Sequence, residues 1–170
     1  MSAYYTFVCS LPYLSFEGEP PMTPKEFVER AAFYLKDEEI SDLTGKDRSS
    51  EVGSSWNKWE RSLRSAVAAV RAGRVGKEFQ PDRLGTEILD GMTRQTLSDL
   101  YKTEAPMRIE RGLDEVRFNK LDELASGHFF DYVVIFCYYQ KLLILTRWKG
   151  LDVEGGREVV KNCCAIKQNT

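Results

Sequence analysis

The feature that most constrains this chain is an apolar, aromatic segment, His128 to Trp148. A helix that spans a bilayer needs about 20 consecutive apolar residues, and a charge at its centre costs about 3 kcal/mol on the insertion scale. Asp131 lies near the start of the segment, and Gln140 and Lys141 interrupt it again. The segment is too short and too interrupted to span, so we expect a core helix, residues 129–148, surrounded by other helices.

Length and composition indicate one globular domain. The chain has 170 residues, of which 42% are hydrophobic and 29% charged, with a formal net charge of −2. That length can bury a sizeable core, and these fractions are ordinary for a globular protein. A nucleic-acid-binding protein is usually strongly basic, which this chain is not. We predict a single helical domain over residues 1–170, with a less ordered loop at 46–53.

The cysteines and the N-terminal segment indicate the compartment. The cysteines form no disulfide framework, because Cys137 lies inside the apolar segment and Cys163 and Cys164 are adjacent. The opening MSAYYTFVCSLPYL lacks the basic start and the small-residue cleavage site of a signal peptide. We therefore expect a cytoplasmic protein without direct membrane insertion.

Start signals and apolar spacing predict the other helices. Thr23 can cap a helix whose Glu26 reaches back to the Thr23 amide, and a shorter helical piece after it ends near Gly45. Residues 1–16 form either a strand or a helical turn. The remaining periodic segments are 54–77, capped by Ser54 or Ser55, 82–104, 105–125 and 152–165. The predicted class is all-α, a bundle of about six or seven helices around the central apolar helix.

The search for reactive groups finds little. The single histidine, His128, follows Gly127 at a helix start, where we expect a cap or a surface residue. A zinc site needs about four ligands in suitable spacing, which the chain lacks. Glu110 and Asp114 lie four residues apart on one helical face, which indicates either a solvated face of ion pairs or the buried carboxylate site of an enzyme. We predict no catalytic residue, no metal and no cofactor, with the enzyme as an alternative.

The helix at 54–77 carries the most unusual surface. Four arginines lie within an arc of about 140° beside the tryptophan face of this helix. The predicted interaction surface consists of Trp56, Trp59, Arg61, Arg64, Arg71 and Arg74. Such an arginine stripe can bind an acidic partner or the phosphates of RNA. It can equally flank a buried face and pair with acidic neighbours. A small helical nucleic-acid or anion-binding protein is therefore an alternative function.

Two segments of the chain resemble an uncharacterised bacterial family whose genes lie among those for V-type ATPase subunits. The first is the opening YYTFVCSLPYLSF, residues 4–16, followed by EPPMTPKEF, residues 19–27. The second is the C-terminal half, which matches the family pattern at Glu110, Leu113, Asp114, Arg117, Phe118, Leu121, Asp122, Glu123, Phe129, Phe130, Asp131, Tyr132, Tyr138, Lys141, Leu142, Arg147, Trp148 and Gly155.

The chain has a tyrosine-rich start and a helix of the form Tyr-x-x-Lys-Leu, from Tyr138 to Leu142, that ends in Arg147. In these features it is distantly similar to the C (or d) subunit of V-type and archaeal-type ATPases, an all-α subunit that seats the central rotor shaft on the membrane ring. Because this chain is much shorter, it resembles one half of that subunit. The resemblance implies a non-enzymatic accessory or stalk-type component of a bacterial V-type ATPase or ATP synthase, acting through protein–protein contacts. The implied partners are ATPase subunits of the stalk or rotor region, and the implied location is cytoplasmic, at the periphery of the inner membrane. The family has no established activity, so no residue inherits a catalytic role.

Overall fold

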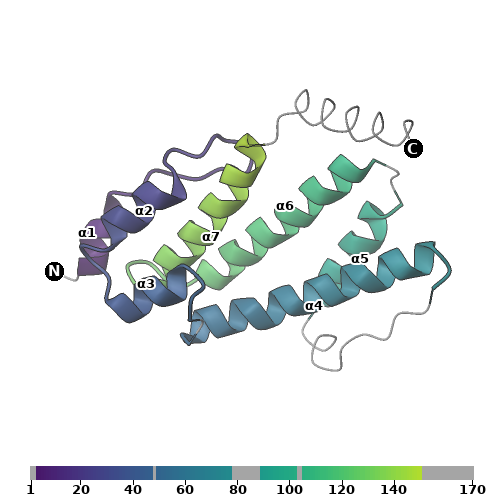
Figure 1. Ribbon diagram of the computed structural model, residues 1–170, viewed down its shortest axis with the longest axis horizontal. Coiled ribbons are helices and arrows are strands. Elements are labelled where there is room, and N and C mark those ends of the chain that lie inside the picture. The colour runs from purple at the N-terminus through teal and green to yellow at the C-terminus, as the bar shows by residue number, and fades with distance from the viewer. Residues whose placement is uncertain (1–2, 48, 78–88, 103–104, 151–170) are drawn as a thin grey trace, which may run out of the picture.

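The computed structural model describes residues 3–47, 49–77, 89–102 and 105–150, and within these ranges the chain forms seven α-helices and no strand (Figure 1). The all-α prediction is therefore confirmed, and the N-terminal segment is helical. The helices are α1 (Ala3–Cys9), α2 (Pro24–Ala31), α3 (Asp37–Leu43), α4 (Glu51–Arg74), α5 (Gly91–Leu100), α6 (Pro106–Ala125) and α7 (Tyr132–Lys149).

Helix α7 forms the centre of the bundle, as its sequence predicts. It packs against α6 along most of its length and also contacts α1, α2, α3 and α4 (Figure 1). The side chains of Ile135, Phe136 and Leu142 are fully buried. An apolar helix surface must be covered to leave water, which is why the shorter helices gather around this one.

In the part of the chain that the structure describes, not one helix combines the length and the apolar content that crossing a bilayer requires.

Ring contacts join α1, α2 and α7. The ring of Phe27, on α2, lies 5.4 Å from the ring of Phe7 on α1. The same ring lies 5.4 Å from Tyr138 and 5.4 Å from Tyr139, both on α7. Aromatic pairs at these separations add about 0.5–1.5 kcal/mol each beyond the area they bury. The aromatic N-terminal segment is thus an integral part of the core.

The expected capping box starts α2. Thr23 accepts a hydrogen bond from the Glu26 backbone N–H, and the Glu26 carboxylate accepts one from the Thr23 N–H at 2.7 Å. Helix α4 begins earlier than predicted, with Ser50 as its N-cap instead of Ser54 or Ser55. The Ser50 hydroxyl accepts a hydrogen bond from the Gly53 N–H at 2.9 Å, which satisfies a donor that the first turn leaves open.

A buried carboxylate fixes the start of α4 against α3 and α7. Asp42, on α3, is 1% exposed and accepts a hydrogen bond from the Ser50 hydroxyl at 2.7 Å. It also accepts hydrogen bonds from the Ser50 backbone N–H at 3.3 Å and from the Tyr132 hydroxyl, on α7, at 2.6 Å. A Cβ atom on Gly53 would lie 2.4 Å from an Asp42 carboxylate oxygen, so the first turn of α4 can approach this carboxylate only with glycine there.

The central helix begins at Tyr132, three residues later than predicted. Asp131 is its N-cap and accepts a hydrogen bond from the Val134 N–H. The preceding Phe129 and Phe130 are outside the helix, and they are 72% and 46% exposed. An N-cap aspartate fixes where a helix begins, so the residues before it lie outside the helix even when they are apolar.

The helix predicted at 82–104 is shorter where the structure describes it. Helix α5 begins at Gly91, because the Asp90 carboxylate accepts a hydrogen bond from the Thr93 N–H at 2.7 Å and so caps the helix. It ends at Leu100. Residues 82–88 and 103–104, and the predicted helix at 152–165, lie outside the described residues.

The packing of α7 predicts the cost of truncating one of its rings. Phe136→Ala should lower the free energy of unfolding by about 3–5 kcal/mol, because a fully buried ring is lost and a cavity remains. Phe33→Ala, at a side chain that is 87% exposed, is the matched control and should change stability by less than about 0.5 kcal/mol. Urea denaturation measures both. A loss below about 1 kcal/mol for Phe136→Ala would contradict the placement of α7.

The same packing predicts the reactivity of a thiol. Burial raises the pKa of Cys137 to about 12, and the nearby Lys141 only partly offsets this. At pH 8 the Cys137 thiol is therefore protonated and covered, while Cys9 is exposed. Iodoacetamide should alkylate Cys9 and leave Cys137 unmodified until urea unfolds the chain, as peptide mass spectrometry can measure. Equal labelling rates in the native protein would show that α7 is not buried as described.

Candidate functional site

A chain of ion pairs crosses the bundle between α4, α6 and α7. Its centre is Asp114, on α6, whose side chain is only 2% exposed. One carboxylate oxygen accepts a hydrogen bond from Arg117 Nη1 at 2.9 Å. The other lies 2.6 Å from Arg147 Nη2 and accepts a hydrogen bond from the Trp148 indole N–H at 2.8 Å, both from the end of α7. Asp114 therefore ties two helices together through three donors.

The ion pairs continue from α6 to α4. Arg117 uses Nε and Nη2 to bind both oxygens of Glu60, each with a closest separation of 3.0 Å. Glu60 is 9% exposed and also accepts a hydrogen bond from Arg64 Nε at 2.8 Å. A planar guanidinium bound by two parallel hydrogen bonds fixes orientation as well as distance. The Arg117–Glu60 pair thus sets how α4 lies on α6.

The other end of the chain of ion pairs reaches α5. Arg147 Nη2 lies 3.9 Å from Glu110, and Arg71 Nη2 donates to the same carboxylate at 2.8 Å. Arg71 Nε donates to the Tyr101 hydroxyl, just after α5, at 2.8 Å. We call this set the charge network, and its members are Glu60, Arg64, Arg71, Tyr101, Glu110, Asp114, Arg117, Arg147 and Trp148.

The network is stable because its buried charges are compensated. An unpaired buried carboxylate is costly, whereas a pair with good geometry and satisfied hydrogen bonds recovers that cost. Burial alone lowers the pKa of Arg117, but the hydrogen bonds and charges of Glu60 and Asp114 outweigh it and hold that pKa above its usual value. Arg117 therefore stays charged. The helical repeat supports this arrangement, since Glu60 and Arg64 share one face of α4 and Asp114 and Arg117 share one face of α6.

The two carboxylates that suggested an enzyme both belong to this network. Glu110 is partly exposed and Asp114 is buried, and each is held by arginine. Both Asp114 oxygens are occupied by donors. Within the described ranges, no three His, Cys, Asp or Glu side chains come close enough to hold a metal ion. His128, which we expected at a cap or on the surface, is exposed and lies 2.5 Å from Asp131.

The predicted interaction surface on α4 is divided by the fold. Trp56 and Trp59 are 6% and 2% exposed, so both rings pack in the core, although Trp59 also lines the groove described below. This corrects the tryptophan part of the prediction: the face that we read as flanking a surface packs inward. Of the arginines, Arg64 and Arg71 belong to the charge network.

Arg61 and Arg74, the other two arginines of the stripe, are exposed and make no ion pair with any residue that the structure describes. Their role in an interaction surface stays a prediction.

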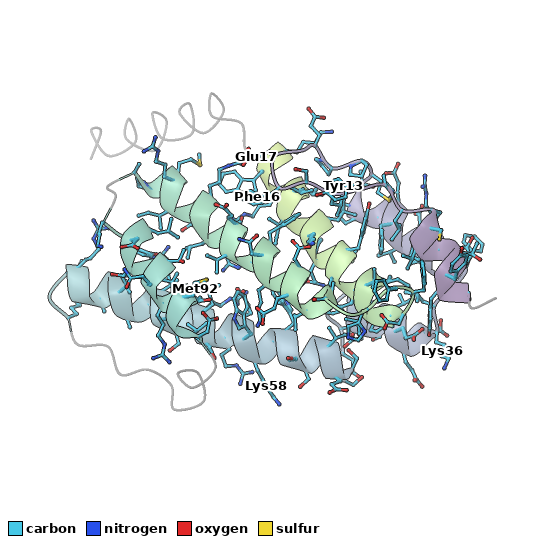
Figure 2. The ribbon with its side chains drawn as sticks, turned by 180° about the vertical axis from the view of Figure 1, so that it is seen from behind. Tyr13, Phe16, Glu17, Lys36, Lys58 and Met92 are labelled. Atoms are coloured by element: carbon cyan, nitrogen blue, oxygen red, sulfur yellow. The ribbon has the colours of Figure 1, made fainter. Side chains whose placement is uncertain are left out.

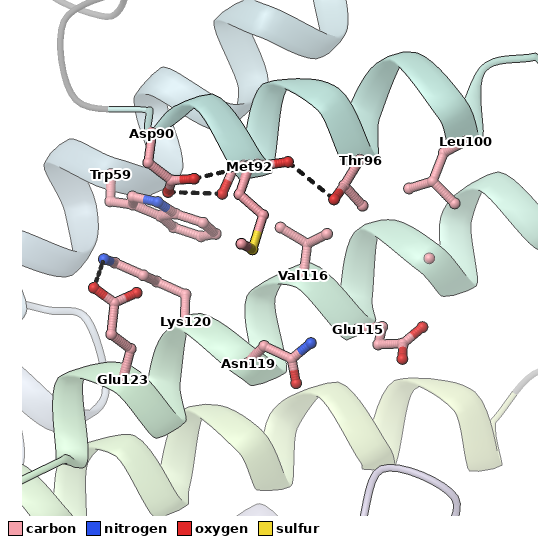
Figure 3. A pocket seen from close by; sticks show the side chains of 12 residues that line it. Trp59, Asp90, Met92, Thr96, Leu100, Glu115, Val116, Asn119, Lys120 and Glu123 are labelled. Carbon is pink, nitrogen blue, oxygen red and sulfur yellow. Dashed lines mark hydrogen bonds and ion pairs between the residues drawn. The ribbon is translucent and has the colours of Figure 1, made fainter.

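A groove lies between α5 and α6, with α4 behind it (Figure 3). It encloses about 660 Å³ and is lined by Trp59, Asp90, Met92, Thr93, Thr96, Leu100, Gly112, Glu115, Val116, Asn119, Lys120 and Glu123. The Trp59 indole N–H is buried there, and no described residue accepts its hydrogen. A buried donor left without a partner costs about 1–3 kcal/mol. We call this feature the α5–α6 groove.

Several aromatic rings are exposed at the end of the molecule where α1 meets the start of α7. The rings of Tyr5 and Phe130 lie 4.6 Å apart, and Phe129 stands beside Phe130 in the chain. All three are more than two-fifths exposed. We call Tyr5, Phe129 and Phe130 the aromatic end. Contiguous exposed rings of this kind usually mark a contact site.

Sequence reasoning found some of these residues and missed others. In the sequence Lys120 lies on the otherwise apolar face of Ile109, Leu113, Val116 and Leu124, and the structure places it in the wall of the α5–α6 groove. The partnership of Glu60 with Arg117 gave no signal, because the two residues are 57 positions apart. Met92 lies among the apolar positions of the helix predicted at 82–104, yet its side chain is 82% exposed (Figure 2).

The fold and these features define an all-α bundle with an internal charge network and two open surfaces. Residues 92–168 match a protein family described as "Protein of unknown function (DUF2764)". The matched range includes α6, α7 and most of α5, hence the Asp114, Arg117 and Arg147 part of the charge network, and it covers less than half of the chain. No curated protein and no solved structure matches the chain.

The charge network predicts unequal costs for two aspartates. Asp114→Ala should destabilise the protein by about 3 kcal/mol, because the buried charge of Arg117 then loses one of the two carboxylates that pair with it. Asp99→Ala removes a solvent-exposed pair with Lys102 and should leave stability almost unchanged, because water screens such a pair. Urea denaturation of both variants at equal ionic strength makes the comparison. Similar small losses would show that the network contributes little to stability.

Proposed function

We propose that this protein is a non-enzymatic accessory or stalk-type component of a bacterial V-type ATPase, acting through protein–protein contacts. The proposal takes its partner from the sequence resemblance of the N-terminal segment and the C-terminal half to a family encoded among V-type ATPase genes. It takes its mode of action from the arrangement of the exposed side chains. The implied relation to one half of the C (or d) subunit is part of the same proposal.

The observation that carries the proposal is that both resembling segments meet at the aromatic end. Tyr5 comes from the opening segment, and Phe129 and Phe130 come from the second one. The backbone around them is fixed from within. Tyr4 donates a hydrogen bond to the Glu39 carboxylate at 2.6 Å, and Tyr132 donates one to Asp42. Tyr4 and Tyr132 thus bind α3, while Tyr5 and Phe130, from the same two segments, keep their rings exposed.

The physical argument is one of cost. A large ring that faces water loses the free energy that burial provides, about 1.5–3 kcal/mol for a phenylalanine. These rings lie next to a core that would accept apolar side chains, yet the Asp131 cap keeps Phe129 and Phe130 outside α7. A partner that covers them recovers this free energy, and aromatic residues at the centre of an interface carry much of its affinity.

The anion-binding alternative has weaker support. Arg64 and Arg71 are bound to Glu60 and Glu110, so phosphates would have to compete with carboxylates already in place. Arg61 and Arg74 are 13 positions apart on α4, about 20 Å along the helix axis. Two isolated arginines at that separation make a poor phosphate site, so we place the protein-binding role first.

Affinity capture from native cells tests the proposal. The tagged full chain should recover V-type ATPase subunits that mass spectrometry identifies by sequence. Phe129→Ser combined with Phe130→Ser should lower their recovery by about ten-fold, the effect of losing about 1.4 kcal/mol of binding. Tyr13→Ser, at a ring that is 91% exposed and does not belong to the aromatic end, should leave recovery unchanged.

Two results would contradict the proposal. The wild-type chain could recover no ATPase subunit from cells that express the ATPase. Alternatively, the double variant could recover the subunits as well as the wild type does, which would remove the aromatic end as the contact. Circular dichroism of each variant confirms that it remains folded before recoveries are compared.

A further inference from the structure

We propose that the α5–α6 groove binds a basic amphipathic helix of a partner protein. This inference rests on the proposed function only in that the occupant is a protein. It concerns a different surface from the aromatic end, and different side chains carry it.

The shape of the groove fits a helix. Its α6 wall consists of Gly112, Glu115, Val116, Asn119, Lys120 and Glu123, which follow one another at helical spacing. They form a single stripe over three turns of α6, about 17 Å long. Helix α5 forms the opposite wall (Figure 3). A groove between two helices is a common receptor for a third helix that lays its apolar face into it.

Apolar side chains from both helices line part of the groove. Leu100 and Val116 face the space from α5 and α6, and Met92 reaches over it from α5 (Figure 3). A Cβ atom on Gly112 would lie 2.3 Å from Leu100, so glycine lets the leucine side chain lie against the α6 backbone. Met92 is unbranched and adaptable, which suits a surface that must fit an incoming side chain. This part of the groove accepts leucine-like residues.

The charge of the groove selects a basic occupant. Among the lining residues that the structure describes, Asp90, Glu115 and Glu123 contribute three carboxylates and Lys120 one ammonium, a net charge of −2. The Lys120 ammonium lies 2.9 Å from Glu123 and is already paired. Hydrogen bonds from the Thr93 backbone and hydroxyl hold the pKa of Asp90 below its usual value, so Asp90 is ionised at neutral pH. Lysine or arginine beside the apolar face of the occupant complements these carboxylates.

The Trp59 indole N–H is a hydrogen-bond donor without an acceptor among the described residues, which favours a ligand that supplies one. The Trp59 indole is 2% exposed, and no residue in the described ranges accepts its N–H. Figure 3 shows this indole reaching into the groove beside Asp90 and close to Lys120. A polar side chain or an end carbonyl of a bound helix supplies the missing acceptor. An apolar occupant without such a group would leave the donor buried and unsatisfied.

Titration of the full chain with a designed peptide tests the inference. The probe is a peptide of about 18 residues, five helical turns, with leucine on one face and lysine on the other. In a proton–nitrogen correlation spectrum the three tryptophans give three indole signals. The Trp59 signal, assigned by its absence in Trp59→Phe, should move as the peptide binds and its N–H gains an acceptor. The Trp148 signal should stay in place, since that N–H is bound to Asp114.

Charge variants supply the matched controls. Glu115→Lys should weaken binding of the lysine peptide by about ten-fold at low ionic strength, because it converts an attractive charge into a repulsive one. Asp47→Lys makes the same change of charge at an exposed residue between α3 and α4 and should change affinity by less than about two-fold. A second peptide with glutamate in place of lysine should bind far more weakly than the first.

Three outcomes would overturn the inference: no saturable binding of the lysine peptide, equal binding of the glutamate peptide, or equal effects of Glu115→Lys and Asp47→Lys. A stationary Trp59 signal during saturable binding would also overturn it, because the peptide would then sit elsewhere. The titration contains no ATPase subunit, so its failure leaves the capture experiment unaffected, and failure of that capture leaves the titration unaffected.

Discussion

The burial of α7 is the constraint from which the rest of the structure follows. This helix is apolar around most of its circumference, so no single neighbour can cover it. Helix α6 covers one side, and the short helices α1, α2 and α3 cover others with the help of α4. The aromatic rings of Phe7 and Phe27 complete the cover. The N-terminal segment is therefore structural, although on its own it is too short to be a stable helix.

Covering an apolar helix leaves open how its neighbours are oriented, and the charge network supplies that orientation. Apolar packing tolerates several rotations of one helix against another, whereas a bidentate Arg117–Glu60 pair tolerates few. Asp114 extends the same control to the end of α7 through Arg147 and Trp148. Because these charges satisfy one another, the network holds helices in place and offers little free charge to a ligand.

The two open surfaces differ in kind, which bears on how the protein can act. The aromatic end consists of exposed rings, two of which the helix cap at Asp131 keeps out of α7. The α5–α6 groove is concave and acidic, with an unsatisfied Trp59 donor. A protein with two such surfaces can contact two partners, or two parts of one partner, at once. Linked contacts raise overall affinity beyond that of either contact alone.

The sequence by itself determined the helical class, the burial of the apolar segment and the capping box at Thr23, because periodicity and local hydrogen bonds depend on neighbours in the chain. It could not place the start of α7 correctly, since the hydropathy of Phe129 and Phe130 outweighed the cap at Asp131. Only the tertiary structure decided that Glu60 pairs with Arg117, that Trp59 lies in a groove wall, and that two of the four arginines on α4 are bound internally. Except for Arg64 with Glu60, which are four positions apart, these contacts join residues dozens of positions apart. They depend on the rotation of each helix about its axis, which apolar packing and the ion pairs fix together.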